Sequence, residues 1–291
     1  MSTRQPLKGC ITALATPFSD LKIDYKALSR LIAFQENKKR RAEISGIVIA
    51  GTTGESPTLS DNEKLSMLSF SLEKSALPII MGVGSNDTKK TCDLARLASL
   101  EGAHSLLVVS PYYNRPNPEG LIKHYLSVAE ASDVPIIVYN VPHRTGVDIP
   151  ISVYERLSEH ENIVAVKEAS PEITKVIRAS LGTNLSVYSG NDELALASIA
   201  SGAIGLISVC SNIVPEESAL LIKCALEDKM SDAKAILKRL LPVFDFLFCD
   251  VSPIPLKYAL YKMGLCKNEL RPPLCPLSVA KETLFERLSF F

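Results

Sequence analysis

Short apolar runs alternate with longer amphipathic stretches along the first two thirds of the chain. The runs are rich in β-branched residues and almost continuously hydrophobic, which is typical of parallel strands covered on both faces. The eight runs are Gly9–Leu14, Gly46–Ala50, Pro78–Val83, Ser105–Val109, Pro135–Tyr139, Ile163–Lys167, Leu185–Ser189 and Ile204–Val209. The stretches between them include Tyr25–Lys39, Asp61–Glu73, Thr88–Glu101 and Glu119–Ala131. Their apolar spacing predicts helices with one buried face.

Eight units of strand followed by helix predict an α/β fold, a (β/α)8 TIM barrel. An open doubly wound sheet is the alternative, but Gly82-Val83-Gly84 lacks the third glycine of a dinucleotide-binding fingerprint. Ser60 with Glu63 forms a capping box that predicts the start of the second helix. Only helical patterns continue after about residue 213. We therefore expect a barrel over residues 1–230 and a C-terminal helical region over 231–291.

Composition narrows the class of protein. The 291 residues are 46% apolar with a net charge of zero, which excludes a disordered chain and argues against nucleic acid as a partner. The basic cluster Lys38-Lys39-Arg40-Arg41 is expected to end a helix. No run reaches the roughly 20 apolar residues of a membrane helix, and Thr12 and Thr16 interrupt any signal-peptide core. We expect a soluble, cytoplasmic protein that binds neither nucleic acid nor membrane.

Cysteine and histidine patterns argue against metal chemistry. The seven cysteines form no CxxC pair and are odd in number, so neither a disulfide framework nor a zinc site is expected. Most lie among apolar neighbours and are expected in the core of a protein from a reducing compartment. The four histidines show no HxxxH or HExxH spacing, and no phosphate-binding loop motif is present.

Barrel enzymes place their chemistry at the carboxyl ends of the strands, and one lysine stands there. Lys167 is the only cation within the eight runs. Side-chain alternation puts Ala165 and Lys167 on one face of the strand, and Val166 and Glu168 on the other. A lysine removed from water loses its proton more readily, so its amine becomes a nucleophile towards carbonyls, as a Schiff base requires. The alternative is a lysine that reaches solvent or pairs with a carboxylate.

Other polar residues at these strand ends support the Schiff-base interpretation. Tyr139 ends the neighbouring strand, where its phenol could relay protons, although a core tyrosine fits equally well. Thr52 and Thr53 could cradle a carboxylate or form an ordinary turn. Arg144 could bind a second carboxylate or lie on the surface. Together they indicate a site for a 2-oxo acid and a second acidic substrate.

Several motifs resemble signatures of the dihydrodipicolinate synthase family, within the superfamily of pyruvate-dependent class I aldolases. They are Gly51–Glu55, Pro111–Pro116, Tyr139–Gly146, Val166–Ala169, Ser189–Asp192, Gly205–Val209 and Pro253–Lys257. The resemblance covers nearly the whole chain in order, and its tyrosine and lysine motifs are highly specific for the superfamily.

The resemblance implies a lyase in which Lys167 forms an imine with pyruvate, with no other cofactor. The derived enamine attacks L-aspartate 4-semialdehyde and gives 4-hydroxy-tetrahydrodipicolinate, a step of diaminopimelate and lysine biosynthesis. Tyr139, Thr52 and Tyr113 would form the proton relay, with Tyr113 supplied by a neighbouring subunit. The family is typically a homotetramer built as a dimer of dimers.

The resemblance also implies which residues bind the substrates. Thr53 and nearby backbone amides would hold the pyruvate carboxylate, and Arg144 would receive the carboxylate of the semialdehyde. Gly190 and Ile207 would line the imine pocket through their main chains. N-acetylneuraminate lyases and sugar-acid (2-keto-3-deoxy) aldolases share the lysine and tyrosine but usually lack an arginine at the position of Arg144. They remain alternatives, as do a pyridoxal phosphate enzyme and a catalytically inactive barrel with a binding role.

Two departures from the family pattern concern regulation and the site itself. Asp61, Lys64 and Lys90 stand where lysine-inhibited relatives bind lysine, and the cation Lys90 replaces a carboxylate. Because like charges repel, we expect inhibition by lysine to be weak or absent. Asn191 stands where many relatives have aspartate, and the sequence offers no account of that change.

Overall fold

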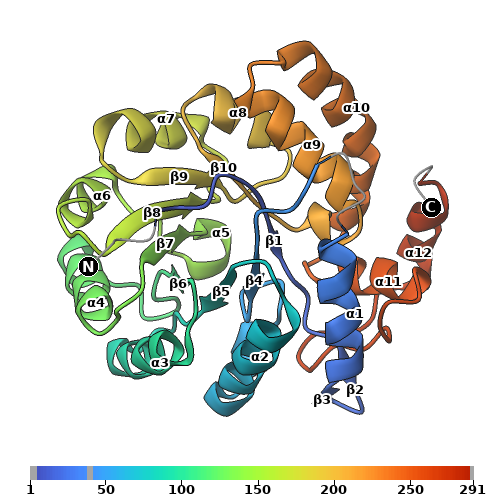
Figure 1. Ribbon diagram of the computed structural model, residues 1–291, viewed down its shortest axis with the longest axis horizontal. Helices are drawn as coiled ribbons and strands as arrows, with labels where there is room; N and C mark the ends of the chain where they lie inside the picture. The colour runs from blue at the N-terminus through green and yellow to red at the C-terminus, as the bar shows by residue number, and fades with distance from the viewer. Residues whose placement is uncertain (1–4, 38–41, 289–291) are drawn as a thin grey trace.

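Eight parallel strands form a closed barrel at the centre of the computed structural model, which describes residues 5–37 and 42–288 (Figure 1). Their order around the barrel is β1-β10-β9-β8-β7-β6-β5-β4. The strands are β1 (Gly9–Ala13), β4 (Gly46–Ile49), β5 (Ile79–Gly82), β6 (Ser105–Val109), β7 (Ile136–Asn140), β8 (Ile163–Glu168), β9 (Ser186–Ser189) and β10 (Gly205–Ser208). A two-stranded antiparallel hairpin, β2 (Phe18–Ser19) and β3 (Lys22–Ile23), follows β1.

Helices surround the barrel and continue beyond it (Figure 1). Those that follow the strands are α1 (Tyr25–Gln35), α2 (Asp61–Lys74), α3 (Thr88–Glu101), α4 (Pro118–Glu130), α5 (Pro142–Thr145), α6 (Ile151–Leu157), α7 (Ile173–Gly182), α8 (Ala195–Ala200) and α9 (Pro215–Leu226). Two 3-10 turns, η1 (Ser56–Thr58) and η2 (Cys210–Asn212), follow β4 and β10. The last helices are α10 (Met230–Leu247), α11 (Ile254–Lys262) and α12 (Val279–Glu286).

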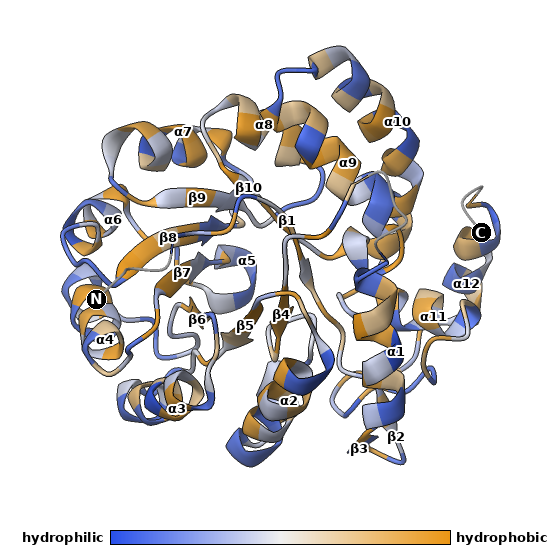
Figure 2. Cartoon of the chain, in the orientation of Figure 1, coloured by the Kyte–Doolittle hydropathy of each residue, from blue (hydrophilic) through white to orange (hydrophobic). Residues whose placement is uncertain are grey.

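Alternation along the strands separates two hydrophobic clusters. Ile11, Ile80, Ala165 and Ile207 belong to the smaller cluster, which fills the barrel. Val166 belongs to the larger cluster, between the barrel and its helices. Figure 2 shows the corresponding hydrophobic colouring of β8, which changes to hydrophilic at the strand's carboxyl end. That end contains Lys167 and Glu168, so polar side chains follow directly after the apolar part of the strand.

The sequence predicted the barrel and all eight strands, with strand ends that differ by a residue. The capping box at Ser60 and Glu63 is present, as predicted. Four of the seven cysteines are buried in the core, and all seven are free thiols. The first helix was predicted too long, because it ends at Gln35 with Glu36 as its C-cap. The basic cluster at 38–41 lies outside the described residues. The hairpin β2–β3 was missed because two-residue strands carry no periodicity.

The C-terminal helices pack beside the start of the barrel. Figure 1 shows α11 and α12 at the edge of the ring near α1. The Arg30 guanidinium of α1 donates to the carbonyl of Leu265, just after α11. The division into a barrel of residues 1–230 and a helical region of 231–291 stays a prediction. Within residues 5–37 and 42–288, none of the helices combines the length and apolarity needed to cross a membrane.

Candidate active site at the carboxyl end of the barrel

Lys167 lies near the carboxyl end of β8 with only 5% of its surface exposed. Parallel pairing places it beside Tyr139 of β7 and Tyr188 of β9. Its Nζ lies 4.4 Å from the centre of the Tyr139 ring. The predicted alternation holds, because Ala165 and Ala169 line the interior with Lys167, while Glu168 points outward and accepts hydrogen bonds from Asn140 and Tyr154. The amine therefore stands largely removed from solvent against a phenol ring.

Gly190, after β9, allows the Lys167 side chain to lie where it does. A Cβ on this residue would approach the Lys167 Cε to 3.1 Å and the Ala169 Cβ to 2.6 Å. Its backbone N–H donates to the carbonyl of Glu168 at 2.7 Å, which draws the two strand ends together. Only glycine leaves room here for a small molecule to reach the amine.

Thr52 and Thr53 lie on a compact turn between β4 and η1. Gly54 N–H donates to the Gly51 carbonyl at 3.1 Å, and Glu55 N–H donates to the Thr52 carbonyl at 3.0 Å. Thr53 is buried and Thr52 is half-buried. The turn holds both threonines at the same end of the barrel as Lys167.

Arg144 belongs to the short helix α5, whereas the sequence placed it in a loop. Its Nη2 donates to the carbonyl of Ser252, which lies between α10 and α11, at 3.0 Å. One donor of the guanidinium fork is thereby fixed to the C-terminal region. The remaining donors are suited to a carboxylate, because the fork binds planar anions bidentately.

One cavity brings most of the predicted residues together. Its lining from the predicted set consists of Thr52, Thr53, Tyr139, Arg144, Lys167 and Gly190. Phe248, Asp250, Val251 and Ser252 complete one wall. No local pattern predicted this wall, because its residues lie far along the chain and reach the barrel only through tertiary packing.

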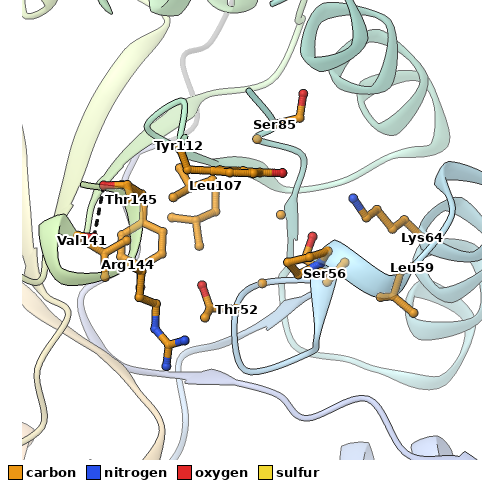
Figure 3. A pocket seen from close by; sticks show the side chains of 17 residues that line it. Thr52, Ser56, Leu59, Lys64, Ser85, Leu107, Tyr112, Val141, Arg144 and Thr145 are labelled. Atoms are coloured by element: carbon orange, nitrogen blue, oxygen red, sulfur yellow. Dashed lines mark hydrogen bonds between the residues drawn. The ribbon is translucent and has the colours of Figure 1, made fainter. Parts of the chain in front are cut away.

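A second cavity adjoins the first and shares Thr52, Tyr139 and Arg144 with it (Figure 3). Figure 3 shows Lys64 of α2 reaching towards this cavity from the side opposite Arg144, with Tyr112 lying across it. Lys64 is 7% exposed, and burial lowers the pKa of its ammonium, an effect that the charge of Asp61 opposes. This cavity therefore presents a buried amine that lies apart from Lys167.

Three residues named in the sequence analysis lie away from the first cavity, and a fourth, Asn191, lines it. Tyr113 is 90% exposed, with a φ of 70°, and lines neither cavity within the described part of the chain. Ile207 is fully buried inside the barrel, and Val209 reaches the cavity wall in its place. Asn191 lines the first cavity and its side-chain oxygen accepts from Glu193 N–H at 3.0 Å. Lys90 is exposed in the first turn of α3.

Asp192 is a buried carboxyl that the sequence analysis quoted within a motif but gave no role. It accepts from the Ser208 hydroxyl at 2.5 Å and from Val209 N–H at 3.0 Å. Burial raises the pKa of Asp192, and these hydrogen bonds together with the charge of Lys167 oppose that rise. Its contacts fix the strand end that carries Val209. The described residues hold no group of three or more His, Cys, Asp or Glu suited to a metal ion.

Comparisons with known proteins agree with this geometry. The profile of the dihydrodipicolinate synthetase family matches residues 6–288. The chain is 40% identical over 281 residues to 4-hydroxy-tetrahydrodipicolinate synthase of Methanococcoides burtonii, covering 95% of each chain. A crystal structure of dihydrodipicolinate synthase from Aquifex aeolicus matches with a TM-score of 0.92 and 40% identity over 96% of each chain.

A further crystal structure, the chloride-inhibited dihydrodipicolinate synthase of Acinetobacter baumannii complexed with pyruvate, matches with a TM-score of 0.92. The two chains are 36% identical, and the match covers 97% of each. Profile, relatives and folds extend over almost the entire chain, including the residues around Lys167. The chain therefore belongs to the dihydrodipicolinate synthetase family.

Proposed function

We propose that the protein is a lyase that condenses pyruvate with L-aspartate 4-semialdehyde to give 4-hydroxy-tetrahydrodipicolinate, in lysine and diaminopimelate biosynthesis. The observation that carries this proposal is the buried amine of Lys167. It lies 4.4 Å from the Tyr139 ring, beside the glycine that makes room for a ligand. The family supplies the reaction, and the cavity supplies the amine, hydroxyls and guanidinium that the reaction needs.

The chemistry follows from those groups. The uncharged Lys167 amine attacks the keto carbon of pyruvate, and water leaves as an iminium forms. Loss of a methyl proton gives an enamine, whose carbon bonds to the aldehyde carbon of the semialdehyde. The amine of the adduct then attacks the imine carbon, closes the ring and releases Lys167. In this proposal Tyr139 and Thr52 move the protons.

We assign the substrate carboxylates to two sides of the cavity. Thr53 and the backbone amides of its turn hold the carboxylate of pyruvate, and Arg144 receives that of the semialdehyde. Arg144 favours this aldehyde over the hydroxylated aldehydes of N-acetylneuraminate lyases and sugar-acid aldolases, because its guanidinium can form two parallel charge-assisted hydrogen bonds with a carboxylate and not with a hydroxyl. The imine itself serves in place of a cofactor.

The proton relay is completed in this proposal by a neighbouring subunit. Tyr113 is exposed and lines neither of the two described cavities of its own chain, which suits delivery of its hydroxyl to a second copy. A homotetramer made of two such dimers is the assembly that we propose.

Borohydride trapping tests the proposal. The protein is incubated with pyruvate, reduced and digested, and the peptides are analysed by mass spectrometry. We expect a reduced pyruvyl adduct on Lys167 and none in Lys167→Ala, with activity at least about a thousandfold lower in the variant. Aspartate semialdehyde and N-acetylmannosamine are then compared as acceptors. A folded wild-type protein without an adduct would contradict the imine mechanism, and a preference for N-acetylmannosamine would favour the lyase alternative.

A further inference from the structure

A buried ion pair connects the C-terminal region to the turn that carries Thr52 and Thr53. Lys257 of α11 and Glu55, two residues after Thr53, have side chains that are 0% exposed, with Nζ and Oε1 3.0 Å apart. The Lys257 ammonium also donates to the carbonyl of Glu269 at 2.9 Å and lies 4.4 Å from the centre of the Phe18 ring. The ammonium is therefore enclosed by groups from three parts of the chain.

The second carboxylate oxygen of Glu55 is also held from the C-terminal region. Its Oε2 accepts from the backbone N–H of Arg271 at 3.0 Å. The guanidinium of Arg271 donates to the carbonyl of Thr58 at 2.7 Å and to both carboxylate oxygens of Glu63. Both ends of the segment that follows the threonines are thus fixed by residues more than 190 positions away, and Glu55 is the point where those contacts meet.

The backbone of Glu55 passes this restraint to the threonines. Its φ of 57° is left-handed, a conformation that a side-chain-bearing residue keeps only when surrounding contacts impose it. Its N–H donates to the Thr52 carbonyl at 3.0 Å, and the neighbouring Gly54 carbonyl accepts from the Thr16 hydroxyl at 2.7 Å. A change at the Glu55 side chain would therefore alter the direction of the Thr52 and Thr53 groups.

Stability alone does not account for a fully buried pair of charges. Removing two opposite charges from water costs about as much as their attraction returns, so apolar replacements are often equally stable. What a buried pair provides is a defined geometry, because each charge has one place where it is compensated. Here that geometry coincides with a turn that faces Lys167.

We propose that Glu55 and Lys257 are positioning residues, which hold the Thr52–Thr53 turn in the conformation that binds the carboxylate of the 2-oxo acid. This inference rests on the proposed function. It assigns to the C-terminal region a part in pyruvate binding, through contacts that touch neither substrate nor the reacting atoms.

Two variants of the full-length protein test this role. Lys257→Met leaves the Glu55 carboxylate buried without its cation. The double variant E55Q/K257M removes both charges and leaves no buried charge unpaired, so it is expected to fold even where the single variant does not. For each protein, the apparent melting temperature, the KM values for pyruvate and aspartate semialdehyde, and kcat are measured. Borohydride trapping is followed as a function of pyruvate concentration.

We expect K257M to melt roughly 5 to 10 °C below wild type, and the double variant to recover most of that loss. The KM for pyruvate is expected to rise about tenfold or more in both variants, because the Thr52–Thr53 turn is no longer held in the conformation that binds the carboxylate. The KM for the semialdehyde should change little. Trapping should require correspondingly more pyruvate.

Tyr258→Phe is the matched control. Tyr258 is the next residue of α11, is equally enclosed at 4% exposure, and contacts α12 through Glu282 rather than the turn. Its variant should keep the wild-type KM for pyruvate. A double variant with a pyruvate KM within about twofold of wild type would overturn the positioning role. Failure of wild type to trap pyruvate at all would instead count against the proposed function.

Discussion

At the scale of single residues, the site depends on the missing side chain of Gly190 as much as on the amine of Lys167. Gly190 leaves the space through which a substrate reaches the Lys167 amine, because any side chain there would meet Lys167 Cε and Ala169 Cβ. The sequence identified Gly190 by resemblance alone. Glycine is required at this position because the ends of β8 and β9 approach closely, and this distance cannot be read from a local sequence pattern.

Replacing Gly190 by alanine is expected to impair the chemistry and also to lower stability, because the new Cβ would come within 2.6 Å of the Ala169 Cβ. The new Cβ would lie 3.1 Å from Lys167 Cε, so the lysine must shift within its cavity. A displacement of about 1 Å at a reacting group costs on the order of a hundredfold in rate. We expect kcat/KM to fall by about that factor, measured in a coupled assay. A G190A protein with wild-type kcat/KM would contradict this account of the close approach.

A second prediction at this scale concerns inhibition by lysine and depends on Lys64. Lys64 is a buried amine at the cavity beside the active site, and Lys90 adds a further cation on α3. A lysine ligand would bring its own ammonium towards these like charges. We expect low-millimolar lysine to leave most of the activity in an initial-rate assay at neutral pH. Near-complete inhibition under those conditions would show that the ammonium finds a carboxylate elsewhere.

At the scale of elements, the start of α2 is stabilised both by a local capping box and by a contact with the distant C-terminal region. The capping box of Ser60 and Glu63 is written in four consecutive residues and was predicted from them. The same Glu63 carboxylate also binds the guanidinium of Arg271, with Nη2 and Oε1 2.5 Å apart. Glu63 thus joins the start of the helix to the C-terminal region, although the sequence predicted only its part in the capping box.

This double use of Glu63 predicts a pH dependence of stability. The hydrogen bond from Arg271, foremost, lowers the pKa of Glu63 from 4.5 to about 2. Because the folded-state pKa is the lower one, the stabilisation is complete above the unfolded value and is lost as the pH falls from about 4.5 to about 2. We expect Glu63→Gln to lower the free energy of unfolding by about 1 to 2 kcal/mol at pH 7.

Urea unfolding of wild type and E63Q at pH 7 and near pH 3 measures the effect. The difference between the two proteins should shrink at the lower pH, since the Glu63 carboxyl of the unfolded chain, with a pKa near 4.5, is protonated there while that of the folded protein is still largely ionised. A difference that stays constant over this range would mean that the Arg271 pair contributes no more than the uncharged cap.

At the scale of the whole molecule, the described chain builds a cavity with an amine, hydroxyls and a guanidinium, while Tyr113 faces outward. In an assembly of identical copies, the same surface is presented by each partner. The proposed relay therefore becomes complete only between two chains. This part of the proposal depends on a contact that a single chain does not contain.

Mixing two inactive variants tests that dependence. Lys167→Ala lacks the amine, and Tyr113→Phe lacks the relay hydroxyl, so each alone should be nearly inactive. In a hybrid dimer, the subunit with an intact Lys167 receives Tyr113 from its K167A partner. Random mixing should restore activity to about a quarter of wild type, because half of the dimers are hybrids with one competent site of two. Hybrids verified by native mass spectrometry but still inactive would contradict delivery of Tyr113 across an interface.

The sequence by itself determined the eight strands, the barrel and, to within one residue, the starts of the four helices for which it offered bounds. These depend on apolar periodicity and on caps within a few residues, so they are local properties. It also placed Lys167 on the inward face and beside Tyr139, because strand alternation and barrel order follow from the same pattern. Of the residues it proposed for the site, six line one cavity, whereas Tyr113 and Ile207 do not.

Only the tertiary structure decided how the C-terminal region meets the barrel. The carbonyl of Ser252 on Arg144, the Lys257 ammonium on Glu55 and the Arg271 guanidinium on Glu63 join residues more than 100 positions apart. No spacing rule links such residues, since each pair is brought together only when the C-terminal region packs against the completed barrel. The local pattern thus places the groups proposed for the chemistry at one end of the barrel, and long-range packing fixes the contacts that hold them there.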